Sequence, residues 1–198
     1  MRKVALVLAA AAVSACAQNP FLSSAPATSP FDMSSPLYGP NFLHIATSSN
    51  LWEVQSSRLA LQVSADPAVR NFAEMTITDH TLLAGDMAAA GKAAGALPPP
   101  PEALMPMDQA KIDQLRATPA TSFDSSYRAM QIAAHQQSIT LFQTYAAQGD
   151  NPILRSMASR ALPMLQKHLA AAQALPVGSA APLPSSPPPP TTTRGERG

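Results

Sequence analysis

The sequence contains a single cysteine, so no intrachain disulfide can form, and zinc sites built from several thiolates are excluded. Charge is also scarce: charged residues make up 13% of the chain, and the 13 basic and 12 acidic side chains nearly cancel. Proteins that bind nucleic acid need a basic surplus, so we expect no nucleic-acid partner. Glycine is limited to eight residues, and no phosphate-binding loop or dinucleotide fingerprint is present. Any metal would therefore have to be held by His, Asp or Glu.

Proline, by contrast, is abundant and divides the chain. Most of its 21 prolines gather in three stretches: residues 20–40, 98–106 and 176–190. Regular helices and central strands do not run through such stretches. We therefore predict a flexible tether over 16–40, one folded unit over 41–175 and a disordered tail over 176–198.

The amino-terminal residues have the pattern of an export signal. Two basic residues precede an apolar run over 4–13, which is too short to stay as a membrane-spanning helix, so 1–15 is predicted to be a signal peptide. Residues 13–16 resemble the bacterial lipobox, which predicts cleavage before Cys16 and lipidation of its thiol. An ordinary cut after Ala17 is the alternative. Under both interpretations the protein is exported, and a lipid anchor at Cys16 would hold it at the bacterial cell envelope on the periplasmic side, with the outer membrane preferred.

Helix starts can be located because proline after a capping residue favours the first helical turn. Three such pairs occur: Asp66-Pro67, Thr118-Pro119 and Asn151-Pro152. With a first helix after Pro40, the predicted helices are 42–64, 67–91, 119–147 and 151–173. A long connection over 92–118, with a short amphipathic piece at 108–116, joins the second helix to the third. The expected fold is all-α, an antiparallel four-helix bundle with the long connection of ferritin-like proteins.

Apolar spacing places several polar residues inside this bundle. His80 and His168 lie on apolar stripes of the second and fourth helices, His135 lies among apolar residues of the third, and Glu53 borders the stripe of the first. At about 1.5 Å rise per residue, all four reach similar depths. They are the predicted metal ligands. Three further side chains are candidates to hydrogen-bond them: Asp79, Asp124 and Tyr127.

The type of metal follows from the ligands. Standard di-iron bundles use a Glu on each of two helices and Glu-x-x-His on the others, whereas Ile77 and Leu165 occupy the positions three before His80 and His168. One Glu and three His suit a single Zn, Fe or Cu ion. Such a bundle would buffer or sense the metal, or protect against stress.

Another interpretation stays open, in which the same residues form a buried polar network without any ion. The protein would then be a non-catalytic structural or interaction lipoprotein, with a protein partner that the sequence does not identify. Oxidative-stress catalysis at the same residues is a third hypothesis, for which the sequence indicates no substrate pocket.

The folded unit also resembles a known family over about 42–175. The resemblance depends on several short groups: Glu53 with Leu59-Ala60, Asp79-His80-Thr81, Phe123-Asp124 with Tyr127 and His135, and Leu162-Pro163 with Leu165 and His168-Leu169. Together they are similar to the bacterial domain of unknown function 4142. The resemblance implies an exported, ferritin-like helical fold and an envelope location, but no activity.

Overall fold

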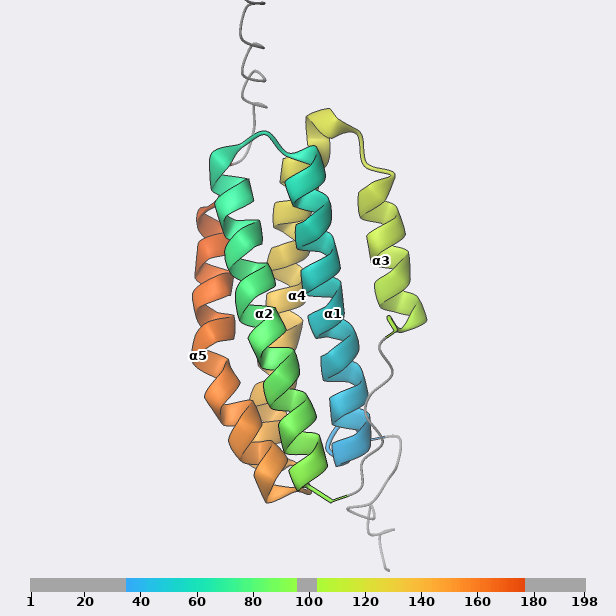
Figure 1. Ribbon diagram of the computed structural model, residues 1–198, viewed down its shortest axis with the longest axis vertical. Coiled ribbons are helices and arrows are strands. Elements are labelled where there is room, and N and C mark those ends of the chain that lie inside the picture. Colours follow the sequence, from blue (N-terminus) through green and yellow to red (C-terminus); the bar gives the residue numbers. More distant parts are fainter. Residues whose placement is uncertain (1–34, 96–102, 177–198) are drawn as a thin grey trace, which may run out of the picture.

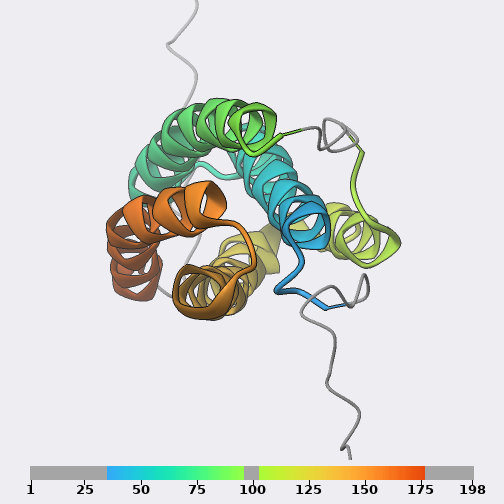
Figure 2. The same cartoon turned by 90° about the horizontal axis from the view of Figure 1, so that it is seen from below.

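The computed structural model describes residues 35–95 and 103–176, and all regular structure in these two ranges is helical. The helices are α1 (Gly39–Val63), α2 (Pro67–Ala93), α3 (Pro106–Arg116), α4 (Ala120–Gln148) and α5 (Pro152–Ala174). Four long helices, α1, α2, α4 and α5, form a bundle, and α3 lies outside it against α1 and α4 (Figures 1 and 2). The predicted four-helix bundle is confirmed. The expectations for the signal peptide, Cys16, most of the tether and nearly all of the tail lie outside the described residues.

The helices are paired as two antiparallel hairpins, α1 with α2 and α4 with α5 (Figure 1). The chain leaves α2 at one end of the bundle, and α3 leads it back to the other end, where α4 begins. As a result α2 and α4 run in the same direction. The predicted long connection is thus a crossover along the length of the bundle.

Two of the three predicted helix caps form. The side chain of Asp66 accepts from the backbone N–H of Ala68, and that of Asn151 accepts from Ile153 and Leu154. The prediction for Thr118 was wrong. Its hydroxyl donates to the carbonyl of Gln114 at the end of α3, and α4 begins one residue late without a side-chain cap.

The core consists of two large apolar clusters with a polar layer between them. Along α2, His80 falls between Phe72 of one cluster and Leu83 of the other, and along α5 His168 falls between Leu165 and Ala172. The apolar stripes predicted for these two helices are buried throughout. The histidines therefore lie near mid-length, with dry packing on both sides.

The inward face of α1 differs from the prediction. Glu53, predicted to border the apolar stripe of this helix, is 1% exposed, and the face turned inward also includes Asn50 and Ser57. The predicted stripe was displaced around the helix, because it was drawn through Ser49 and Ser56 instead of through Asn50 and Ser57. Glu53 is consequently fully inside the bundle instead of at its edge.

The short helix α3 is fastened to α1 through one buried serine. The hydroxyl of Ser48 donates to Asp108, accepts from the backbone N–H of Met105, and so fixes the start of α3. Lys111 pairs with the same Asp108 carboxylate at 3.0 Å. In the described ranges, no helix combines the length and apolarity needed to cross a lipid bilayer.

Candidate metal centre

Three histidines meet in the polar layer, one from each of α2, α4 and α5. We call His80, His135 and His168 the histidine cluster. One ring nitrogen of each lies within 4.8 Å of the others, and the ring centroids form a nearly equilateral triangle with sides of 5.3–5.5 Å. All three side chains are buried, with 2% exposure or less. These predicted ligands are separated by 33 to 88 positions in sequence, and the bundle brings them together.

Each ring of the cluster donates one hydrogen bond to an oxygen outside the cluster. His80 Nδ1 lies 2.8 Å from Asn50 Oδ1, His135 Nδ1 lies 2.9 Å from the carbonyl of Gln131, and His168 Nε2 lies 2.8 Å from Asp79 Oδ2. Carbonyl and carboxylate oxygens only accept, so the bonded nitrogen carries the proton in each ring. The Asn50 amide is itself oriented, because its Nδ2 donates to the His80 carbonyl at 2.9 Å.

The second nitrogen of each ring is left with a lone pair. His80 Nε2, His135 Nε2 and His168 Nδ1 are buried and have no hydrogen-bond partner among the described residues. A buried polar atom without a partner costs about 1–3 kcal/mol. A metal-bound histidine usually donates the N–H of one ring nitrogen to a protein oxygen and binds the ion through the other ring nitrogen.

Burial also keeps the three rings neutral. Burial and the neighbouring ring of His168 together lower the pKa of His135 to about 4, against the opposing hydrogen bond to the Gln131 carbonyl. Burial and both neighbouring rings lower the pKa of His80 well below its usual value. Burial lowers the pKa of His168 as well, although the Asp79 carboxylate opposes this. Neutral imidazole is the form that binds a metal ion.

Glu53, the fourth predicted ligand, lies beside the cluster. It is not part of the group whose possible ligand atoms all lie within 4.8 Å of one another. Its Oε1 is 3.3 Å from His135 Nδ1, whose N–H points to the Gln131 carbonyl. Neither carboxyl oxygen has a hydrogen-bond partner in the described ranges. Burial raises the pKa of Glu53 well above its usual value. The nearby amide of Gln131, which donates its hydrogen bond to Ser56, opposes this rise only in part.

The other predicted partners divide between the cluster and its surroundings. Asp79 forms a hydrogen bond with His168. The hydroxyl of Tyr127 forms its hydrogen bond with Ser57, at 2.8 Å, and not with a histidine of the cluster. Asp124 bonds to no histidine, and its Oδ1 is buried without a partner among the described residues. Tyr127 belongs to the apolar cluster at the end of the bundle where α4 begins, and Asp124 lies about one turn before it on the same helix.

Two residues that position the cluster were not identified from the sequence. Asn50 and Gln131 are fully or almost fully buried, at 6% and 0% exposure. Gln131 lies four positions before His135, and Asn50 lies three before Glu53, so each shares a helix face with a predicted ligand. From this spacing the sequence could have predicted that both residues face the cluster.

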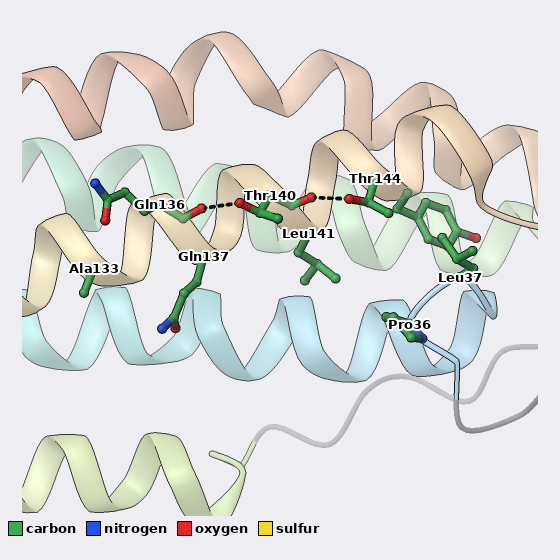
Figure 3. Close-up of a pocket in the computed structure, with 9 residues that line it drawn as sticks. Pro36, Leu37, Ala133, Gln136, Gln137, Thr140, Leu141 and Thr144 are labelled. Carbon is green, nitrogen blue, oxygen red and sulfur yellow. Dashed lines mark hydrogen bonds between the residues drawn. The ribbon is translucent and has the colours of Figure 1, made fainter.

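A pocket in the described residues lies elsewhere. It is a groove of about 520 Å³ on the outer side of α4, next to the segment that precedes α1 (Figure 3). The hydroxyls of Thr140 and Thr144 are used within α4, since they donate to the carbonyls of Gln136 and Thr140. Among the described residues, no acidic, histidine or cysteine side chain lines the groove, so these residues carry none of the chemistry of the cluster.

Comparison with known proteins agrees with this architecture. The sequence profile of the family described as Domain of unknown function (DUF4142) matches residues 24–175. The match begins upstream of the expected position 42 and so includes part of the predicted tether. No curated protein matches the chain. Among solved structures, the chain is similar to one described as "CopM in the Cu(II)-bound form", with a TM-score of 0.58 and 15% identity over 69% of this chain and 93% of that one.

Proposed function

The chain belongs to the DUF4142 family, whose description assigns no activity, and we propose that its bundle binds one transition-metal ion through His80, His135 and His168. The protein would act by holding the ion, as a buffer, a sensor or a protective sink. Glu53 completes the site either as a further ligand or by holding His135 from behind.

The observation that carries this proposal is the pairing pattern of the three rings. In a metal-free polar network, each buried ring would be expected to use both of its nitrogens. Here three nitrogens are paired and the other three have no partner in the described residues. An ion with imidazole ligands would give all three a partner at once.

Three neutral imidazoles favour Zn, Cu or Fe over the hard ions Mg and Ca. Copper should be tested first, because the similar helical structure is that of a protein described in a Cu(II)-bound form. In the ranges that the structure describes, the layer does not provide the four carboxylates of a di-iron site, since Glu53 is the only buried acidic side chain in it.

We also propose that the bundle is held at the bacterial envelope by lipid on Cys16, on the periplasmic side and preferably at the outer membrane. The motif around Cys16 and the preceding apolar run support this. A Cys16→Ser chain should lose incorporated acyl label and leave the membrane fraction. Retention of both would contradict the anchor.

The test of metal binding is elemental mass spectrometry of the full chain, purified without an affinity tag from cells supplied with copper, zinc, iron and manganese. We expect about one ion per chain. A His80→Ala/His135→Ala chain should contain none, because two of the three ligands are removed. The matched control is His44→Ala, which removes the one histidine outside the cluster and should keep the ion. A wild-type chain that is folded by circular dichroism but binds no ion would contradict the proposal.

A further inference from the structure

The three oxygens that orient the histidine cluster differ in their access to solvent. Asn50 and Gln131 are enclosed, whereas the side chain of Asp79 is 28% exposed although it bonds directly to the fully buried His168. Asp79 lies on α2, opposite His168 and Lys167 of α5. We call these three residues the α2–α5 seam. Among the cluster's hydrogen-bond partners, Asp79 alone connects a ligand ring to bulk water.

The charges in the seam suit it to receive a cation. Both contacts of Asp79 use Oδ2, which lies 2.8 Å from His168 Nε2 and 3.9 Å from Lys167 Nζ. In the described ranges Oδ1 has no bonded partner. Asp79 therefore presents a carboxylate oxygen to an arriving cation, while the exposed ammonium of Lys167 repels that cation and competes for the carboxylate.

The helix that carries His168 is interrupted close to this seam. Pro163 lies inside α5 and has no N–H to donate to the carbonyl of Ser159. The helix bends in this region (Figure 1). The ring of His168, about one turn further on, therefore belongs to a helix segment with one hydrogen bond fewer to the rest of α5.

The geometry points to the α2–α5 seam as the route by which a metal ion reaches the histidine cluster, with Asp79 as its first contact and His168 as the ligand that turns to admit it. The inference rests on the proposed function, because it concerns the same site. It assigns Asp79 a role in the rate of loading in addition to its role in orienting His168.

The experiment mixes Cu²⁺ with the metal-free full chain in a stopped-flow fluorimeter. Trp52 is the single tryptophan and packs with Ala134, next to His135, so its quenching reports arrival of the ion. Asp79→Asn keeps an oxygen for His168 but removes the charge, and should lower the loading rate about tenfold. Lys167→Ala should raise it about threefold. Asp86→Asn removes one negative charge from an exposed position on the same helix and should leave the rate within a factor of about two.

The result that overturns the inference is equal loading of the Asp79→Asn and Asp86→Asn chains while each still binds one ion. A change confined to the release rate of Asp79→Asn would also overturn it, because Asp79 would then only orient His168. If the wild-type chain binds no Cu²⁺, Zn²⁺ or Fe²⁺ at all, the proposed function fails and the route fails with it. The binding stoichiometry, measured in parallel, separates these cases.

Discussion

At the scale of single residues, the histidine cluster is built from rings whose tautomers are set by their partners. His80 and His135 carry the proton on Nδ1, and His168 carries it on Nε2, because Asn50, the Gln131 carbonyl and Asp79 are acceptors. A protonated ring would place a second N–H where a partner is lacking and would add charge to a buried layer. The cluster is therefore organised for neutral imidazole.

This neutrality predicts how the stability of the metal-free protein depends on pH. Because the pKa of His135 is about 4 in the folded state and about 6.5 when unfolded, its contribution is complete above pH 6.5 and is lost as the pH falls to 4. That loss amounts to about 3 kcal/mol for His135 alone. His80 and His168 act in the same direction. The raised pKa of Glu53 acts in the opposite direction, but three imidazoles outweigh one carboxyl.

Urea unfolding of chelator-treated protein at pH 7 and pH 4.5 measures this dependence. We expect a clear loss of unfolding free energy at the lower pH, and a smaller one in a His135→Gln chain. An unfolding free energy that does not change between the two pH values would show that the rings are not kept neutral by burial.

The positions of the cluster residues were only partly predictable from the sequence. His80 and His168 could be placed because each lies on a regular apolar stripe. Asn50 and Gln131 could have been found only from their spacing to Glu53 and His135, since a polar residue adds nothing to the apolar pattern that marks an inward helix face. The contact of Asp79 with His168 depends on how α2 and α5 are rotated against each other, and spacing within one helix does not determine that rotation.

At the scale of secondary-structure elements, the start of α3 is fixed by a single buried hydroxyl, while Ile112 and Leu115 bury the apolar face of the helix. A Ser48→Ala chain would leave the buried Asp108 carboxylate without its partner on α1 and the Met105 N–H without an acceptor. We expect the free energy of unfolding to fall by about 2 kcal/mol. Hydrogen exchange should become faster throughout α3, while α2 and α5 keep their protection.

Thr78→Ala is the matched control for that change. The hydroxyl of Thr78 is exposed and donates only to the carbonyl of Glu74 in its own helix, so its loss should alter stability by no more than about 0.5 kcal/mol. Equal effects of the two substitutions would show that α3 is held by its apolar residues instead.

The helix boundaries were predictable wherever local chemistry decides them. Proline after Asp66 and Asn151 gave the start of α2 to the residue and that of α5 to within one residue, because the capping side chains form their bonds within three positions. Thr118 failed because its hydroxyl has a competing acceptor in the preceding helix, Gln114, and that helix had been predicted only as a short amphipathic piece.

At the scale of the whole molecule, ligands from both hairpins meet in one layer, so an ion bound there would stabilise the complete bundle. With free metal at about 100 times the dissociation constant, binding adds about 2.7 kcal/mol to the unfolding free energy. For a bundle of this size we expect the Tm to rise by about 10 °C in scanning calorimetry. The His80→Ala/His135→Ala chain should show no rise, and an equal rise in both chains would place the ion elsewhere.

The topology was predictable because proline divides the chain and one connection is long. The sequence did not determine whether that connection crosses the bundle or stays at one end. The answer comes from Ser48 and Asp108, which hold α3 alongside α1 and so direct the crossover.

Because the histidine cluster is divided between two hairpins, a cut between these hairpins would also divide the site. The α1–α2 hairpin carries His80 and its partner Asn50, and the α4–α5 hairpin carries His135 and His168. A break between α2 and α3 would leave both hairpins whole but neither with a complete site. If the cluster binds a metal as proposed, the two fragments would reassemble as a heterodimer whose affinity depends on that metal, and coordination bonds would take the place of the covalent crossover.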